Sequence, residues 1–204
     1  MTAAGAGRVI AVLGPDGSGK STFSDALVAG PLGGQTIMRL HHRPGVFASR
    51  TPSGVPVTEP HAGTPYARSL SLAKLLFLFM DFRIGWWTQI KPFVRRGGWV
   101  VWERPWWDIS IDPARYRLQG NSRAVRVLGA ALPDPDLVIV LEAPVDVLLA
   151  RKREVSEAEL TRQTEELRHV VPSRVRTAFL DSTQPIAVLL EQATGALDAL
   201  VNHA

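Results

Sequence analysis

The feature that most constrains the fold of this chain is a glycine-rich segment between two runs of different character. Residues 8–13, RVIAVL, form a short β-branched apolar run that is typical of a strand buried on both faces. Residues 20–29 read as a helix that ends at Gly30 and Pro31. The segment between them, GPDGSGKST at residues 14–22, fits the pattern G-x-x-x-x-G-K-[S/T]. This order predicts a phosphate-binding loop at the end of a central strand.

The residue types of this loop suit ATP and its magnesium ion. Gly17 and Gly19 let the backbone curl so that N–H groups point at phosphate oxygens, and the helix N-terminus adds partial positive charge. Lys20 is expected to reach the β- and γ-phosphates, and Ser21 to hold Mg²⁺. A turn that merely joined strand to helix would need neither side chain. The residues predicted to bind ATP are Gly14, Asp16, Gly17, Ser18, Gly19, Lys20, Ser21 and Thr22.

The rest of the chain alternates strand-like with helix-like segments. Strands are expected at residues 36–42, 99–103 and 137–141 and, more weakly, at 175–180, and helices near 122–131, 145–152, 157–169 and 186–201. Such alternation predicts an α/β fold with a three-layer, doubly wound, mostly parallel five-stranded sheet of the P-loop NTPase kind. We expect one domain over residues 1–204, with ligands at the carboxyl ends of the strands.

A long irregular segment follows the second predicted strand. Residues 44–65 hold many of the Pro, Gly, Ser and Thr residues of the chain. Such segments inside compact domains are commonly functional, so we expect an acceptor-binding loop near residues 43–66.

The next segment, residues 66–96, has helical spacing but exceeds an average helix, so Gly85 or Pro92 is expected to divide or bend it. Its most apolar part contains Lys74, Asp81 and Arg83, which predicts a buried helix rather than a membrane span.

Composition limits the partners of the protein. Of 23 basic residues 19 are arginines, and the net charge is +4, which favours an anionic partner. The basic residues are scattered, so nucleic-acid binding is not expected. The chain has no cysteine, which excludes disulfides and thiol nucleophiles and is compatible with a reducing compartment. The N-terminus shows no signal pattern, so a cytoplasmic protein is expected.

A second candidate cluster ends the strand predicted at residues 99–103. Glu103 and Arg104 are expected to enter the same crevice as the phosphate loop. The carboxylate could organise Mg²⁺ or accept a hydroxyl proton, and the arginine could bind an anionic acceptor. The alternative is a surface ion pair at an edge strand. No Asn-Lys-x-Asp guanine motif is present, and the chain is short for a motor ATPase, which leaves a small-molecule kinase.

These motifs together resemble the thymidylate kinase family of nucleoside monophosphate kinases. The matching features are GPDGSGKST, the helix end at residues 90–97, Glu103-Arg104, and the run LEAPVDV at residues 141–147. The resemblance implies that Asp16 contacts a substrate hydroxyl, that Glu103 occupies the acidic position of the family's Asp-Arg-Tyr motif, and that Arg104 holds the acceptor's phosphate. It also suggests a homodimer formed through the long helix.

The same resemblance implies a lid near residues 151–160. Arg151, Lys152 and Arg153 follow a helix at the place where such kinases carry arginines that close on the transferring phosphate. The alternative is a solvated basic helix end that interacts with the helix dipole. Arg151 and Arg153 are therefore candidate catalytic residues, and Arg162 is a candidate of lower rank.

The acceptor pocket departs from the family pattern. Where thymidylate kinases read thymine with an Asp-Arg pair, this chain has Asp81-Phe82-Arg83, and the family's loop after the second strand is replaced by residues 41–45. Asp81, Arg83 and, in the altered loop, Arg43 remain candidate acceptor-binding residues. The pattern is closer to thymidylate kinase-like proteins encoded with bacterial polysaccharide or secondary-metabolite genes, which suggests a dedicated substrate.

Tryptophans and histidines gather near the same part of the chain. All six tryptophans lie between residues 86 and 107. Trp99 and Trp102 are expected in the core, whereas Trp106 or Trp107 could stack on a base or sugar. His41 and His42, adjacent on a strand, point to opposite faces and cannot share a metal.

The sequence thus predicts a MgATP-dependent kinase that transfers the γ-phosphate to a nucleotide-like or sugar-like small molecule. Two alternatives stay open. One is a true deoxynucleoside monophosphate kinase such as a dTMP kinase, and the other is a nucleotide-responsive binding protein that no longer transfers phosphate.

Overall fold

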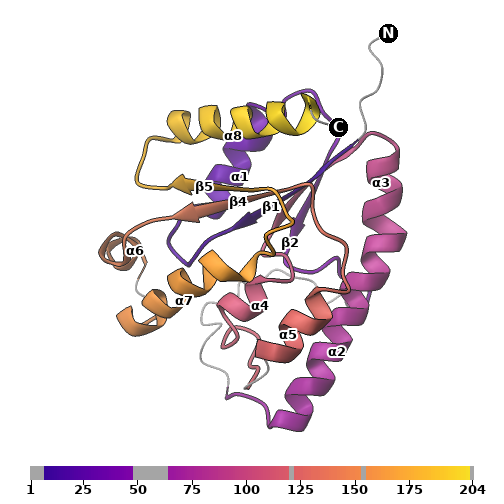
Figure 1. The fold of residues 1–204 in the computed structure, drawn as a ribbon, viewed down its shortest axis with the longest axis vertical. Coiled ribbons are helices and arrows are strands. Elements are labelled where there is room, and N and C mark those ends of the chain that lie inside the picture. Colours follow the sequence, from indigo (N-terminus) through magenta and orange to yellow (C-terminus); the bar gives the residue numbers. More distant parts are fainter. Residues whose placement is uncertain (1–6, 48–63, 120–121, 153–154, 203–204) are drawn as a thin grey trace, which may run out of the picture.

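A single parallel sheet forms the centre of the molecule. The computed structural model describes residues 7–47, 64–119, 122–152 and 155–202. Within these residues five strands form one sheet in the order β2-β3-β1-β4-β5, and every pairing is parallel. The strands are β1 (Val9–Leu13), β2 (Ile37–His41), β3 (Trp99–Glu103), β4 (Leu137–Glu142) and β5 (Thr177–Asp181). The phosphate loop follows the central strand (Figure 1).

Helices cover both faces of this sheet. Their bounds are α1 (Lys20–Ala29), α2 (Arg68–Gly85), η1 (Trp86–Ile90), α3 (Lys91–Arg95), α4 (Asp108–Ile111), α5 (Ser122–Gly129), α6 (Val145–Arg151), α7 (Glu157–Val170) and α8 (Ile186–Asn202). Helices α1 and α8 lie on one face, and α2, α5 and α7 lie on the other (Figure 1). The predicted three-layer, doubly wound α/β fold with a five-stranded sheet is confirmed.

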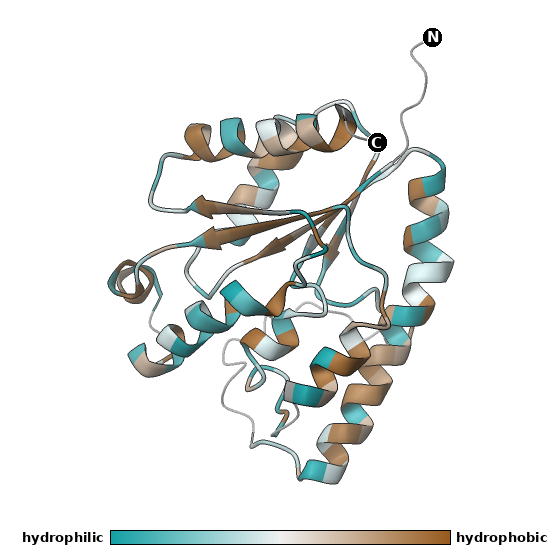
Figure 2. Cartoon of the chain, viewed as in Figure 1, coloured by the Kyte–Doolittle hydropathy of each residue, from teal (hydrophilic) through white to brown (hydrophobic). Residues whose placement is uncertain are grey.

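Alternation along the central strand divides the core in two. Ile10 and Val12 pack with α1 and α8, whereas Val9 packs against α2 and Leu13 against α7. Successive side chains of a strand point to opposite faces, so a strand that is apolar at every position must be covered on both sides. All five β1 residues are buried, and the strands are mostly hydrophobic in Figure 2.

The long helix changes its hydrogen-bonding pattern between the two residues predicted to interrupt it. Regular helix α2 ends at Gly85, and the π-helical segment η1 continues to Ile90 before α3 begins. Pro92 has no N–H, and its ring would clash with the carbonyl four residues earlier in a regular helix. A wider turn, in which the Lys91 N–H reaches the Trp86 carbonyl, accommodates it.

Two elements differ from the sequence-based prediction. The weak candidate at residues 175–180 begins two residues later, as β5 (Thr177–Asp181). Helix α4, residues 108–111, is a single buried turn that was not predicted, because one turn is too short to show periodicity. Among the described helices, none is both long and apolar enough to cross a membrane.

Candidate active site

The phosphate loop leaves β1 at Gly14 and enters α1 at Lys20. Gly17 has φ +85°, and a side chain there would place its Cβ 3.0 Å from the carbonyl oxygen of Leu148, so both conformation and space favour glycine. Gly19 also has positive φ and precedes the first residue of the helix. Ser18 is buried, and its Oγ has no hydrogen-bond partner among the described residues. The loop thus reaches α1 through two left-handed glycines and holds one buried hydroxyl that has no partner in the described part of the chain.

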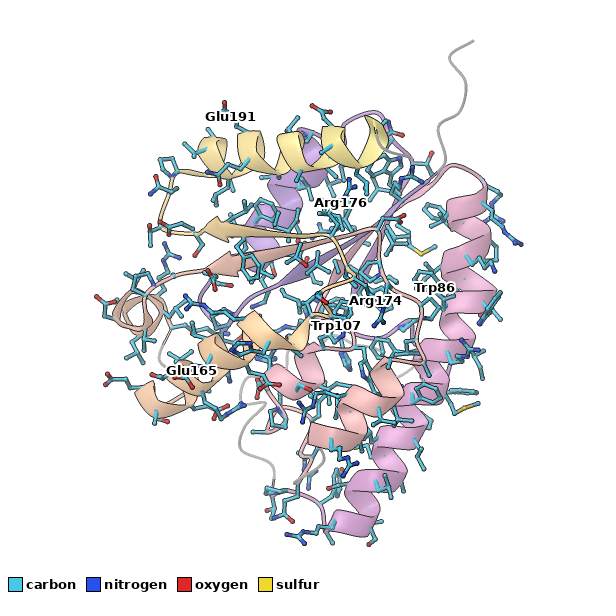
Figure 3. All side chains as sticks on the ribbon, in the orientation of Figure 1. Trp86, Trp107, Glu165, Arg174, Arg176 and Glu191 are labelled. Carbon is cyan, nitrogen blue, oxygen red and sulfur yellow. The ribbon has the colours of Figure 1, made fainter. Side chains whose placement is uncertain are left out.

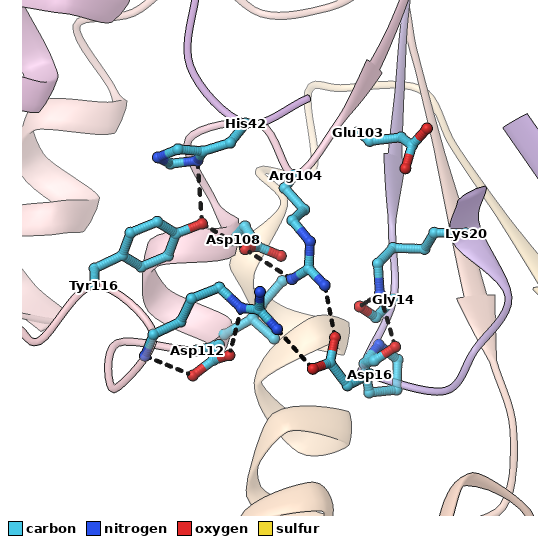
Figure 4. Close-up of polar contacts among 12 residues, drawn as sticks. Gly14, Asp16, Lys20, His42, Glu103, Arg104, Asp108, Asp112 and Tyr116 are labelled. Atoms are coloured by element: carbon cyan, nitrogen blue, oxygen red, sulfur yellow. Dashed lines mark hydrogen bonds and ion pairs between the residues drawn. The ribbon is translucent and has the colours of Figure 1, made fainter. Parts of the chain in front are cut away.

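Lys20 is folded back onto its own loop. Its Nζ donates to the carbonyl oxygens of Gly14 at 2.6 Å and Pro15 at 2.7 Å (Figure 4). Burial of the ammonium group, together with repulsion from Arg104, lowers the pKa of Lys20 to about 8. The ammonium group is still mostly protonated at neutral pH. The two carbonyl oxygens therefore bind a cation, and an anion could compete with them for it.

Glu103 and Ser21 bring β3 and the loop together. The Ser21 Oγ donates to Glu103 Oε2 at 2.9 Å, and Arg39 Nη2 donates to Glu103 Oε1 at 3.0 Å. His41 Nδ1 lies 3.5 Å from Oε2. Burial alone would raise the pKa of Glu103, but the hydrogen bonds from His41, Ser21 and Arg39 outweigh it and lower this pKa to about 2. The carboxylate is therefore ionised throughout the physiological range.

Arg104 lies at the turn that follows β3, and its side chain enters the crevice. It follows the last residue of β3 with φ +54°, a left-handed conformation that is costly for a side chain of this size. Its guanidinium donates to Asp16 Oδ1 at 2.6 Å and to Asp108 Oδ2 at 3.4 Å (Figure 4). Burial would lower the pKa of Arg104, but the two carboxylates raise it. The strained turn places a buried cation between the phosphate loop and α4.

Asp16 joins a second arginine to this cluster. Arg115 Nη2 donates to Asp16 Oδ2 at 2.6 Å, and Arg115 Nε donates to Asp112 Oδ2 at 3.1 Å. The Arg115 backbone N–H also donates to Asp112 Oδ1. Burial would raise the pKa of Asp16, but the charges of Arg104, Lys20 and Arg115 lower it well below its usual range. Two guanidinium groups and three carboxylates thus alternate in the order Asp108, Arg104, Asp16, Arg115 and Asp112.

His42 and Tyr116 close the crevice on the other side of Arg104. The Tyr116 hydroxyl donates to Asp108 Oδ2 at 2.7 Å and lies 3.1 Å from His42 Nδ1 (Figure 4). Burial lowers the pKa of His42 to about 4, and it raises the pKa of Tyr116 well above its usual value, with a further contribution from Asp108. Both rings are therefore uncharged at neutral pH and form a polar edge beside the acidic cluster.

Two solved structures with the same arrangement of elements are thymidylate kinases. That of Candida albicans has a TM-score of 0.66 and 17% sequence identity, with 98% of this chain and 95% of that chain covered. That of Ehrlichia chaffeensis has a TM-score of 0.62 and 17% identity, covering 94% of this chain and 98% of that chain. The chain has a thymidylate kinase-like fold. At the sequence level no protein-family model and no curated protein matches it.

Within this thymidylate kinase-like fold, Asp81 fixes the loop after β2. Its side chain is fully buried, and it accepts hydrogen bonds from the backbone N–H groups of Gly45 at 3.1 Å and Phe47 at 2.9 Å. Arg43 Nη1 lies 3.6 Å from Asp81 Oδ2. The structure thus gives Asp81 a set of partners within the protein, whereas the sequence suggested a role in acceptor binding. Most of the predicted loop, residues 48–63, lies outside the described residues.

The other two candidate acceptor residues contact helices. Arg83 Nη1 points to the carbonyl of Ala131 at 3.4 Å, beyond the end of α5. Trp107 is half-buried and packs against two of the core clusters. Trp86 and Trp107 both lie on the side of the sheet that faces the long helix (Figure 3). Trp106 is buried, and its indole N–H donates to the Val125 carbonyl at 2.8 Å, so it belongs to the core.

The predicted lid arginines are described in part. Arg151 ends α6, where Nη2 donates to the Ser182 carbonyl at 3.0 Å and Nη1 lies 3.5 Å from the Gly17 carbonyl oxygen. It lines a pocket with Thr22 and Gln184 on the outer side of the phosphate loop. Lys152 Nζ lies 3.8 Å from Asp16. Arg153 is outside the described residues, and Arg162 pairs with Glu159.

Four residues of the crevice were not singled out as site residues from sequence: Asp108, Asp112, Arg115 and Tyr116. They lie on and after helix α4, which is too short to give a periodic pattern in the sequence. One signal was available, because the stretch WDISIDPARYR at residues 107–117 concentrates acidic and basic residues directly after Arg104. Charged residues grouped after a central strand could have been read as parts of the crevice.

The burial of His42 gives a pH-dependent stability. A histidine that is neutral in the folded state, with its pKa lowered from 6.5 to about 4, stabilises the fold above pH 6.5 and loses that effect as the pH falls toward 4. Asp108 faces the ring and favours its protonation, whereas Arg43 and His41 oppose it. We expect the melting temperature to fall over this interval, and His42→Gln to flatten the decline. An unchanged slope in the variant would contradict this assignment.

Proposed function

We propose that this protein is a MgATP-dependent kinase that transfers the γ-phosphate to a small-molecule acceptor. The observation that carries the proposal is the junction at the carboxyl ends of β1 and β3. There the phosphate loop with Lys20 meets the Ser21–Glu103 contact and the buried Arg104. The thymidylate kinase-like fold supports the same conclusion at the level of architecture.

The residues of the loop fit the phosphates of ATP. Backbone N–H groups of the loop provide donors, as does the Ser18 Oγ, which is unpaired among the described residues, and the N-terminus of α1 provides partial positive charge. The pocket beside Gly19, lined by Arg151, Gln184 and Ile186, is placed to receive the base and ribose. This makes Arg151 a nucleotide-binding residue in our proposal, and its bonds to Ser182 hold it there.

Two oxygen donors fit a magnesium ion. Ser21 Oγ and Glu103 Oε2 are 2.9 Å apart, and Mg²⁺ usually takes one or two protein oxygens, phosphates and waters. When bound, the ion neutralises charge on the phosphates. A pKa of about 2 makes Glu103 a weak base, so we assign it the role of magnesium organiser rather than proton acceptor.

The remaining residues act by position and charge. Phosphoryl transfer needs little covalent help from the protein, so aligned cations supply most of the stabilisation. Lys20 exchanges its two carbonyl partners for phosphate oxygens, and Arg104 orders the acceptor side through Asp16 and Asp108. We include a cytoplasmic location in the proposal, because the proposed reaction consumes ATP.

One assay tests the proposed activity. Purified protein is incubated with MgATP and a panel of deoxynucleotides, nucleosides, sugars and sugar phosphates, while ADP release and product mass are followed. We expect ADP formation that depends on one class of acceptor. Tight MgATP binding without any phosphorylated product would instead favour a nucleotide-responsive binding protein.

A second candidate function is a deoxynucleoside monophosphate kinase. Two solved structures that share the fold are thymidylate kinases, which is the observation in its favour. Conversion of dTMP to dTDP by the purified protein would establish it.

The carboxylate of Glu103 offers a graded test of its role. Glu103→Gln keeps the shape and a hydrogen bond to Ser21 but removes the charge, so we expect turnover to fall by about 10–100-fold and the magnesium concentration for half-maximal rate to rise. The matched control is Glu191→Gln on the exposed surface of α8 (Figure 3). If Glu103 were the general base, high magnesium would restore nothing.

We also propose that the long helix joins two copies of the chain. Its exposed face carries a row of large apolar side chains that are 44–59% exposed: Leu70, Leu72, Leu76, Phe77, Met80 and Trp87. Such a row is unusual on a monomer, and a two-fold axis would pair it with itself. We expect a dimer by sedimentation and a monomer for Phe77→Glu. Val127→Glu, at an exposed position of α5, is the control that should stay dimeric.

A further inference from the structure

A cavity separate from the crevice lies at the opposite end of the sheet. Its lining comes mainly from segments that lead into three neighbouring strands: Arg8 before β1, residues 134–136 before β4, and residues 174–176 before β5. The phosphate loop instead follows the carboxyl end of β1. Because the five residues of β1 span roughly 16 Å, the length of the sheet separates this cavity from the proposed ATP site (Figure 1).

The cavity has room for a small molecule. Its volume is about 330 Å³, and pockets that bind small ligands begin at about 300 Å³. Pro135, Val175 and Leu200 form the apolar part of its wall, and the other described lining residues are arginines and aspartates. The wall therefore suits a ligand that carries both a charged group and a carbon skeleton.

Positive charge exceeds negative charge in this lining. Five charged residues line the cavity, which we call the arginine cavity: Arg8, Arg174, Arg176, Asp134 and Asp136. Three positive and two negative formal charges leave a balance of +1. Both carboxylates are engaged within the protein. Asp134 accepts a hydrogen bond from Arg174 Nε at 2.6 Å. Asp136 Oδ2 accepts one from the backbone N–H of Val9 at 2.7 Å, so the surplus lies with the arginines.

Each of these arginines keeps donors that the described part of the chain does not use. Arg8 Nε is buried and has no hydrogen-bond partner there, which costs free energy unless a ligand or a water satisfies it. Arg176 bonds the described residues through Nη1, which donates to the Ala199 carbonyl at 2.7 Å. Arg174 uses Nε and Nη2 for Asp134 and keeps Nη1. The Arg174 side chain is 52% exposed, and a surface pair of that kind is weak enough to exchange with a second anion.

A phosphate group suits this set of donors. The guanidinium group presents its N–H donors in a planar fork that matches phosphate oxygens, and a phosphate monoester offers three such oxygens. We propose that the arginine cavity is a second ligand site, distinct from the ATP and acceptor sites, and that it binds a phosphate monoester of a small organic molecule. The organic part lies against the apolar wall of Val175 and Leu200. The proposal does not depend on the kinase function.

Probes that differ by one chemical group test the proposal. The protein is saturated with MgADP, which occupies the phosphate loop, and is titrated calorimetrically with ribose 5-phosphate, ribose and inorganic phosphate. We expect saturable binding of ribose 5-phosphate that weakens with added salt, and no binding of ribose. Inorganic phosphate should bind at least about tenfold more weakly, because it makes no contact with the apolar wall.

Two results of these titrations would overturn the proposal. One is the absence of saturable binding of ribose 5-phosphate below about 10 mM, which is weaker than specific sites bind. The other is equal affinity for inorganic phosphate, which would show that the cavity does not recognise an ester.

Substitutions show whether the probe lies in the arginine cavity. Arg8→Met and Arg176→Met each remove one guanidinium group, so each should weaken the binding of ribose 5-phosphate by at least about tenfold, the usual loss for a hydrogen bond to a charged group. Arg126→Met, at an exposed position of α5, removes the same charge elsewhere and should bind like the unmodified protein. Binding that is unchanged in both cavity variants would lie elsewhere and overturn the proposal.

A gain of affinity provides a test that misfolding cannot imitate. Asp134→Asn removes the carboxylate that competes for Arg174, so ribose 5-phosphate should bind about three- to tenfold more tightly. Glu165→Gln, on the exposed face of α7, changes the net charge equally and should have no effect (Figure 3). Unchanged or weaker binding in Asp134→Asn would contradict the proposal. None of these measurements uses phosphoryl transfer, so they and the kinase assay can fail independently.

Discussion

Replacing Lys20 by methionine is expected to lower kcat/KM for phosphoryl transfer by about 10²–10³-fold, the usual cost of losing one preorganised charge from a transition state. The methionine keeps the length and bulk of the side chain but cannot neutralise the β- and γ-phosphates. ADP release with the best acceptor measures the loss, and calorimetry of MgATP binding separates binding from turnover.

The matched control for this variant is Lys91→Met. Lys91 stacks over the ring of Trp87 on the long helix and touches no residue of the phosphate loop in the described contacts. Its loss should leave turnover within about twofold of the unmodified protein. Retention of more than a tenth of the activity by Lys20→Met would show that the lysine does not act on the transferred phosphate.

Replacing Arg104 by methionine is expected to destabilise the fold by about 3–5 kcal/mol. Removal of one partner from a buried ion pair leaves the other charge buried without its counter-ion. Asp16 would keep Arg115, but the Asp108 carboxylate would lose its guanidinium. Urea denaturation followed by circular dichroism gives the free energy of unfolding directly.

Two further variants show whether burial is the cause. Arg174→Met breaks a pair in which the arginine side chain is 52% exposed, so it should change stability by less than about 1 kcal/mol. The double variant Arg104→Met, Asp108→Asn should recover part of the loss, because it removes the uncompensated charge. A loss for Arg104→Met no larger than that for Arg174→Met would contradict a buried network.

Most of the fold could be predicted because three of its strands, β1, β3 and β4, are apolar at nearly every position. A central parallel strand such as β1 gives a strong local signal, and the first residue of α1 was marked by the glycines before it. The widened turn at Trp86–Ile90 could be placed only between Gly85 and Pro92, since its hydrogen bonds depend on how the helix packs. Helix α4 has too few residues to give any pattern.

The site residues differ in the same way: some could be placed from local sequence signals, and others depend on packing. Lys20, Ser21, Glu103 and Arg104 lie at fixed positions relative to a motif or a strand end, so their neighbourhood followed from topology. The acceptor-binding role of Asp81 stays a prediction, whereas its hydrogen bonds to the backbone of Gly45 and Phe47 were not foreseen. Partners of that kind are set by how a loop lies on a helix, which the spacing of residues along the chain does not encode.

The widened turn in the long helix changes which way each half of that helix faces. One extra residue in a turn rotates every later side chain by about 100°, the angle between neighbours on a helix. Helix α2 can therefore present Leu75, Leu78 and Phe82 to the core, while Val94, after the bulge, is brought round to pack on the same cluster.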